Sequence, residues 1–131
     1  MTLATVGHDG VWATAVFYAN INFNLFFLSA GHTRHAQNFR HQEKIAATIQ
    51  EDYRDWPTIK GIQLEGIVEQ LNGARQISAI AHYTQKFPFL ANASTQIAAA
   101  LTKVNWYQLT PTRLYFIDNS KGLGHRVQIA L

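Results

Sequence analysis

The sequence of 131 residues contains no cysteine. Disulfide scaffolds, thiolate metal sites and cysteine nucleophiles are therefore all excluded. No apolar run approaches the roughly 20 residues that a membrane-spanning helix needs. The first residues, Met1 to Val6, lack the basic region and the apolar core of a signal peptide. We therefore expect a soluble, cytoplasmic protein with no membrane partner.

Charge is also scarce, because charged residues make up 15% of the chain while hydrophobic residues make up 47%. This balance is typical of a globular protein and not of a disordered one. The net charge of +3 is well short of the basic excess of a nucleic-acid-binding arm, so no nucleic-acid partner is expected. The length predicts one domain over residues 1–131, large enough to bury a core.

The first part of the chain shows patterns typical of strands. Leu3–Val6 and Val11–Asn20 flank Asp9-Gly10, a dipeptide that predicts a hairpin turn in which both central residues have positive φ. After a turn at 20–24, the run 25–29 is apolar on both faces, which indicates a strand buried in the core or at an interface.

Two further strands are predicted at 45–50 and 62–69. In the second, Ile62, Leu64, Gly66 and Val68 share one face. A glycine within such a strand suggests a bend, a bulge or a close backbone approach. The tail is expected to return to strands at 106–109, 114–117 and 127–131, with a turn at Thr110–Thr112 and a polar loop over 118–126, where Gly122-x-Gly124 is read as a turn.

Three helices are predicted. Thr33 is expected to cap a short helix that runs to about His41. A second helix has Ile77, Ile80, Ala81 and Thr84 on its apolar face and closes at Phe87-Pro88, and a third, over 94–103, presents Ile97 and Leu101. Strands that do not alternate with helices indicate an α+β fold and count against a doubly wound sheet. We expect an antiparallel, Greek-key-like barrel of six or seven strands with peripheral helices.

The densest polar cluster, Ser29 to His35, lies where the buried strand becomes a helix. A helix N-terminus offers free N–H groups and a positive dipole end, and Ser29, Thr33, Arg34 and His35 add side-chain donors for an anion such as phosphate. A capped helix with an exposed basic face explains the same residues equally well. His32 and His35 lack the further ligands of a metal site, so no metal is expected, and no catalytic triad or carboxylate pair stands out.

The order of several segments resembles the pyridoxamine 5′-phosphate oxidase-like, FMN-binding split-barrel family. The resemblance extends over nearly the whole chain, and it is nearest to small uncharacterised bacterial members with Thr-Arg-His-Ala-Gln in this place and a Gly-x-Gly loop near the C-terminus. The segments that carry it are Leu3-Ala4-Thr5, Asp9-Gly10, Phe26-Phe27-Leu28-Ser29, Thr33-Arg34-His35-Ala36-Gln37-Asn38, Ile62-Gln63-Leu64-Glu65-Gly66 and Leu109 to Asp118.

The resemblance implies a homodimer with two FMN sites at the subunit interface. It places Thr33, Arg34 and His35, with Ser29 before them, at the FMN phosphate, in agreement with the anion site inferred from the residues themselves. It also implies that the Ala13–Tyr18 strand faces the flavin ring, through Ala15, Val16 and Tyr18, and that Lys60 polarises the ring. His125 and Arg126 resemble the pair that holds the substrate phosphate in the oxidase, although a basic surface loop explains them as well.

The chain departs from the family at several contact positions. Ala13, Gly61 and Ile117 stand where the oxidase has an Arg, a Gln and a Trp, and His35 replaces a Lys. Family members usually have a helix before the first strand, whereas this sequence begins directly on it. Fewer fixed cations weaken phosphate binding. Pyridoxamine phosphate oxidase activity is therefore not expected.

The leading interpretation is an FMN-dependent oxidoreductase of unknown substrate. The alternatives are a binding protein that holds another flavin or haem without turnover, and a ligand-free structural dimer.

Overall fold

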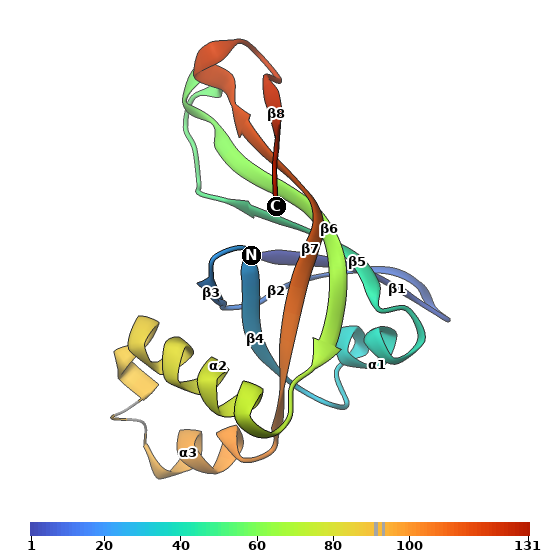
Figure 1. The fold of residues 1–131 in the computed structure, drawn as a ribbon, viewed down its shortest axis with the longest axis vertical. Helices are drawn as coiled ribbons and strands as arrows, with labels where there is room; N and C mark the ends of the chain where they lie inside the picture. Colours follow the sequence, from blue (N-terminus) through green and yellow to red (C-terminus); the bar gives the residue numbers. More distant parts are fainter. Residues whose placement is uncertain (91, 93) are drawn as a thin grey trace.

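The computed structural model describes residues 1–90, 92 and 94–131. One antiparallel sheet is the framework of the described part (Figure 1). Its strands are β1 (Thr2–Gly7), β2 (Gly10–Ala15), β3 (Ala19–Ile21), β4 (Asn24–Ala30), β5 (Lys44–Gln50), β6 (Lys60–Gln70), β7 (Val104–Asp118) and β8 (Arg126–Ile129). The helices are α1 (Arg34–His41), α2 (Gly73–Lys86) and α3 (Thr95–Leu101), with short 3-10 turns η1 (Trp56–Thr58), η2 (Pro88–Leu90) and η3 (Asn119–Lys121).

The strands follow the order β2-β1-β5-β6-β7-β4-β3, and β8 adds to the other half of β7. The predicted antiparallel α+β fold is confirmed, with eight strands in place of six or seven. The path does not close, because among the described strands β2 pairs only with β1 and β3 only with β4. Beyond the barrel, β6, β7 and β8 continue as an arm that projects away from the helices (Figure 1). No described helix is long and apolar enough to cross a membrane.

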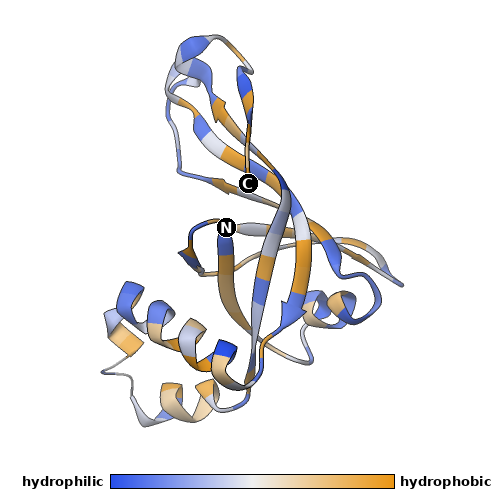
Figure 2. Cartoon of the chain, in the orientation of Figure 1, coloured by the Kyte–Doolittle hydropathy of each residue, from blue (hydrophilic) through white to orange (hydrophobic). Residues whose placement is uncertain are grey.

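Two apolar clusters explain why the strand β4 is apolar on both faces. Leu25 and Phe27 point into the main core inside the sheet. Phe26 points the other way, into a second cluster that α2 covers with Ala79 and Tyr83. The apolar side chains on both faces of β4 are thus covered within the chain, so this strand gives no support to an interface. Figures 1 and 2 show α2 beside β4.

The predicted apolar face of α2 is wrong. Ile77 is 70% exposed and Ile80 is 36% exposed, whereas Ala79 and Tyr83 are buried. Tyr83 packs edge-on against Trp106 of β7, with ring centroids 5.2 Å apart. The helix has apolar residues on two faces, and the larger aromatic contact decides which one is covered.

The turn predicted at Thr110–Thr112 is also wrong, because β7 runs unbroken through it. Pro111 lies opposite Gly66, and the register of β6 and β7 shifts between Glu65 and Gly66. A proline cannot donate to a neighbouring strand, and a bulge accommodates that missing hydrogen bond. A Cβ on Gly66 would lie 2.3 Å from the carbonyl oxygen of Thr110, so the predicted bulge and close approach at Gly66 are confirmed.

The first hairpin forms with a turn shifted by one residue. Its two loop residues are His8 and Asp9, and of the residues around the turn only Gly10 has a positive φ, of 87°. The predicted strand Val11–Asn20 is interrupted, because β2 ends at Ala15 and β3 begins at Ala19. The turn after β3 holds Asn22 at a φ of 51°, a conformation that asparagine tolerates better than most residues.

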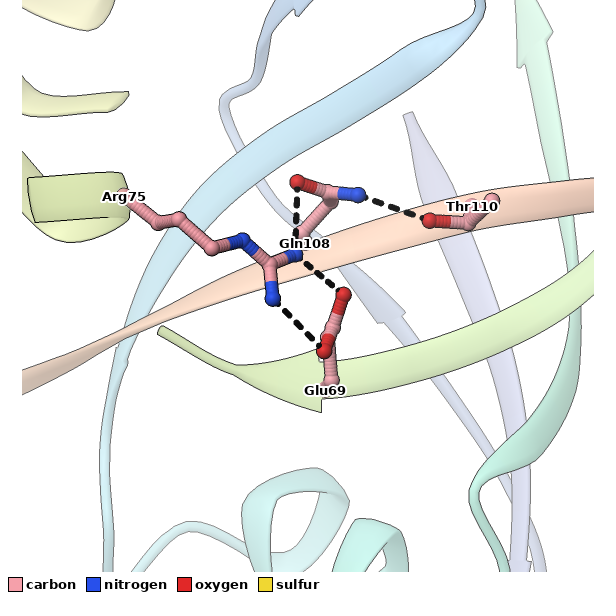
Figure 3. A network of polar contacts seen from close by, with 4 residues as sticks. All are labelled: Glu69, Arg75, Gln108 and Thr110. Carbon is pink, nitrogen blue, oxygen red and sulfur yellow. Dashed lines mark hydrogen bonds and ion pairs between the residues drawn. The ribbon is translucent and has the colours of Figure 1, made fainter. Parts of the chain in front are cut away.

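A surface network fastens the start of α2 to the sheet (Figure 3). Arg75 of α2 binds both carboxylate oxygens of Glu69 on β6, and it also donates to Gln108 of β7 at 3.3 Å. Gln108 in turn donates to Thr110 at 2.8 Å. The hydrogen bonds from Arg75 lower the pKa of Glu69. Because the pair is exposed, we expect it to fix the direction of the helix more than it adds stability.

Gly66→Ala is expected to destabilise the protein by about 1–3 kcal/mol, because the new methyl group meets the backbone of β7 and overpacks the bulge. Urea denaturation measures the effect. Gln63→Ala, on an exposed position of the same strand, is the matched control. Equal stability of the two variants would show that the close approach at Gly66 carries no cost.

Candidate functional site

Helix α1 is held on the β1–β2 hairpin by a buried hydrogen bond. The Asn38 side chain donates to the hydroxyl of Thr5 at 2.9 Å, and that hydroxyl donates to the backbone oxygen of Trp12 at 3.3 Å. Gly7 makes room for this contact, since a Cβ there would overlap the Asn38 amide. This contact therefore fixes the position of α1 on the hairpin.

Arg34, the first residue of α1, binds the same hairpin from outside. Its guanidinium donates to the backbone oxygen of Asp9 at 2.7 Å and lies over the Trp12 ring, 4.6 Å from the centroid. Among the described residues, Arg34 donates from one terminal nitrogen only, to the backbone oxygens of Asp9 and Val11, and its other N–H donors can bind a ligand. The helix start thus carries one fixed positive charge.

The N-terminus of α1 has no side-chain cap. The helix begins where the sequence predicts, after Thr33, but the Thr33 hydroxyl donates to the backbone oxygen of Ala30 at 2.9 Å and caps nothing. The first N–H to find an intrahelical acceptor is that of Gln37, which binds the Thr33 oxygen. The N–H groups of residues 34–36 precede it and have no intrahelical acceptor, the arrangement that binds anions at other helix N-termini.

Ser29, Thr33 and His35 form a closed chain of hydrogen bonds. The Ser29 hydroxyl lies 2.6 Å from Nε2 of His35 and 3.0 Å from the Thr33 hydroxyl. Since Thr33 donates to Ala30, each proton finds one acceptor if His35 Nε2–H donates to Ser29 and Ser29 donates to Thr33. These side chains, which were predicted as phosphate donors, are thus engaged with one another. Their arrangement fixes the turn between β4 and α1.

Burial keeps His35 neutral. The residue is 7% exposed, and desolvation lowers the pKa of its imidazole. A protonated ring here would bring a second N–H donor and a charge into a site whose hydrogen bonds are already complete. Of the predicted phosphate group, only Arg34 therefore offers a charge at neutral pH.

Tyr18 and Lys60 lie together at the other end of the barrel. Both line a cleft of about 420 Å³, with Met1, Ile49, Gln50, Glu51, Tyr53, Gly61, Ile62 and Phe116. Ser29 pairs with Asn105 at the start of β7, whereas Lys60 pairs with Asp118 at its end. These two positions are thirteen residues apart along β7, which corresponds to about 40 Å along the strand. Lys60 is therefore remote from Ser29 along β7, whereas Tyr18 directly precedes Ala19, which pairs with Phe26, three residues before Ser29.

The remaining predicted contacts are also dispersed. Ala15 and Val16 line a shallow pocket with Met1 and Phe17. Arg126 covers the Tyr115 ring at 4.6 Å and donates to Gln63, on the sheet face opposite to Phe116, while His125 lies in the turn before β8. Their assignment as substrate ligands stays a prediction.

The three positions that depart from the family lie in different parts of the structure. Gly61 lines the Lys60 cleft, Ile117 pairs with it across β6 and β7, and Ala13 is exposed on β2. Within the described residues, no group of three metal-ligating side chains comes together.

Sequence reasoning missed the residues that position α1. Thr5 and Gly7 come from β1 and Asn38 comes from α1. Thr5 and Asn38 are 33 residues apart in the sequence. Nothing in the local pattern marks such a pair. The apolar walls of the Lys60 cleft, Ile49, Ile62 and Phe116, were read only as strand residues.

Comparison with known proteins identifies related sequences. The chain is 31% identical to a UPF0306 protein of Photorhabdus laumondii, over 97% of this chain and 84% of that protein. It is 33% identical to a UPF0306 protein of Enterobacter sp. strain 638, over 93% of this chain and 82% of that protein. No family model matches the chain.

Solved structures with the same fold have lower sequence identity. A heme binding protein from Mycobacterium smegmatis superposes with a TM-score of 0.77 at 18% identity, over 98% of this chain and 51% of that one. HutZ, the heme storage protein from Vibrio cholerae, superposes with a TM-score of 0.71 at 18% sequence identity, over 86% of this chain and 82% of that one. A candidate pyridoxamine 5′-phosphate oxidase from Listeria innocua superposes with a TM-score of 0.64 at 13% sequence identity, over 89% of this chain and 86% of that one. The predicted split-barrel fold is confirmed.

Stability is expected to fall as the pH is lowered through about 6.5, the pKa of an unfolded-state histidine. The unfolded chain then takes up a proton that buried His35 resists, because its folded-state pKa is lowered, and the loss ends once the pH is below that pKa. Urea denaturation at pH 7.5, 6.5 and 5.5 should show a shallower fall for His35→Gln than for the wild type. His32→Gln, at an exposed position of the same segment, is the control, and an equal change in both would contradict the role of burial.

Proposed function

We propose that this chain, which belongs to the UPF0306 family, is a homodimeric FMN-binding protein that acts as a flavin-dependent oxidoreductase. The observation that carries the proposal is the uncapped N-terminus of α1 beside Arg34. The N–H groups of residues 34–36 and the helix dipole suit a phosphate, which carries about −1.5 to −2 charges at neutral pH.

Thr33, Ser29 and His35 have a positioning role in this proposal. Their closed chain of hydrogen bonds sets the turn that presents the helix start, while the contact to phosphate falls to backbone N–H groups and Arg34. FMN supplies hydride transfer when it is bound, and the protein supplies binding, orientation and electrostatics.

A partly exposed apolar row across β5, β6, β7 and β8 supports the homodimer. Ile49, Ile62, Phe116 and Val127 are paired in register across β5, β6, β7 and β8, so their side chains share one face of the sheet. The neighbouring row on that face, Ala47, Leu64, Leu114 and Ile129, lies at the edge of the main core. Phe116 is 37% exposed and Val127 is 45% exposed. A contiguous apolar face of this kind marks an interaction surface.

A second copy on this face also resolves the separation of the predicted site. The start of α1 and Lys60 lie at opposite ends of β7, because Ser29 pairs with Asn105 and Lys60 pairs with Asp118. In the proposed dimer, two copies related by a twofold axis present each end twice, with α1 of one copy placed against the cleft of the other. Lys60 is the cation that this arrangement brings to the flavin ring.

Haem is a second candidate. The solved structures described as a heme binding protein and a heme storage protein share the fold, and the cleft contains Tyr18 and Tyr53, whose phenolic oxygen is a known type of haem ligand. Lys60 would then face a propionate. Histidine is the commoner ligand, however, and no described histidine lines this cleft, so the site favours FMN.

The visible absorption spectrum of the purified protein, repeated after incubation with FMN and dialysis, tests the function directly. A retained flavin spectrum is the expected result. A Soret band would assign the cleft to haem. A colourless protein that retains no FMN would overturn the flavoenzyme and leave the ligand-free structural dimer.

Arg34→Ala is expected to weaken FMN binding about 10- to 100-fold, because a hydrogen bond to a charged group contributes roughly 1.5–3 kcal/mol. Riboflavin, which lacks the phosphate, should bind both proteins equally. Arg40→Ala, at the exposed end of the same helix, is the matched control. Fluorescence titration measures the affinities, and an unchanged FMN affinity of Arg34→Ala would place the phosphate elsewhere.

A further inference from the structure

We propose that a cavity in the open end of the barrel binds a small neutral aromatic molecule that carries one hydrogen-bonding group. This cavity has a volume of about 240 Å³ and adjoins the Lys60 cleft, with which it shares Tyr18, Ile49 and Ile62. Its other lining residues are Asn20, Asn22, Phe23, Leu25, Leu64 and Leu114. The proposed ligand is distinct from FMN, although the two sites share these three walls, because all of the cavity contacts come from one chain.

The cavity exists because the barrel does not close. Strand β3 is three residues long and pairs on one side only, with β4. The strands β4, β5, β6 and β7 supply the floor, where Leu25, Leu64 and Leu114 belong to the main core. The β3–β4 turn supplies the rim, and its Phe23 is 43% exposed. An aromatic ring at the mouth of an apolar pocket gains burial when a ligand fills the space beneath it.

The lining decides the charge of the ligand. None of the nine side chains that line the cavity is ionised at neutral pH, and the nearby Lys86 ammonium is engaged with the Tyr18 ring, so a charged molecule would lose its hydration without gaining an ionic partner in the lining. The floor is aliphatic, which suits a ring or another apolar group. A cavity of about 150 Å³ holds a benzene ring, so the volume here is sufficient for one substituted ring.

The lining of the cavity also contains polar side chains. The Asn20 amide donates to the backbone oxygen of Asn22 at 3.1 Å, and among the described residues its carbonyl oxygen takes part in no side-chain hydrogen bond. The hydroxyl of Tyr18 lies on the same lining, and its ring is held by Lys86, whose ammonium is 4.1 Å from the centroid. An acceptor and a hydroxyl near an aliphatic floor recognise a ring with a single polar substituent.

Benzamide and benzoate are matched probes, because they share a shape and differ in charge. We expect benzamide to give saturable amide shifts in an NMR titration, centred on residues 20–25, 62–64 and 114, and benzoate to bind at least about tenfold more weakly. Phe23→Ala should weaken benzamide binding about tenfold through the loss of an aromatic wall. Phe89→Ala, at another exposed aromatic residue, should leave it unchanged.

Ile62→Trp is a second variant, because its larger side chain fills the cavity, and it should abolish the amide shifts. Its circular dichroism should match that of the wild type, which shows that the variant is folded. Equal affinity for the two probes, shifts centred elsewhere, or binding that is indifferent to both Phe23→Ala and Ile62→Trp would overturn the proposal. FMN binding is measured separately by its absorption, so a failure of the flavin site is distinguished from a failure of this cavity.

Discussion

The buried hydrogen bond between Asn38 and Thr5 determines where helix α1 lies, and the polar end of the molecule depends on it. Both residues are almost fully buried, and the contact fits only because Gly7 has no side chain. A buried polar pair of this kind has few alternative arrangements, since either partner alone would be left unsatisfied. The direction of α1 in turn sets the position of Arg34 against Asp9 and Trp12, and with it the site at the helix start.

Local patterns in the sequence predict the parts of the fold that depend on neighbours in the chain. The alternation over 62–69 is the pattern of β6, and the start of α1 after Thr33 follows from residues next to it. The failures involve distant partners. Whether Thr110–Thr112 turns or continues as β7 depends on the bulge at Gly66, and the covered face of α2 depends on Trp106. Neither partner is visible in a local window.

The same limit applies to the candidate site. Ser29, Thr33 and His35 lie within seven residues, and their predicted proximity is confirmed by direct hydrogen bonds. The chemistry expected of them changes, because proximity lets the donors satisfy one another before any ligand does. Lys60 and Tyr18, in contrast, come together from separate segments at the opposite end of β7. Resemblance to a family transfers residue types to a site but does not show which copy of the chain brings them there.

The two ends of the molecule differ in kind, and this difference constrains the function. The α1 end offers backbone N–H groups and an arginine around a closed polar turn, which suits a charged group. The barrel end offers aliphatic and aromatic walls with Lys60 and Lys86 nearby, which suits a ring. A ligand with both a phosphate and a planar ring therefore needs both ends at once. Since Lys60 and the start of α1 lie at opposite ends of β7, the proposed dimer contact would bring them into one binding site, and the partly exposed row from Ile49 to Val127 is the surface along which it would form.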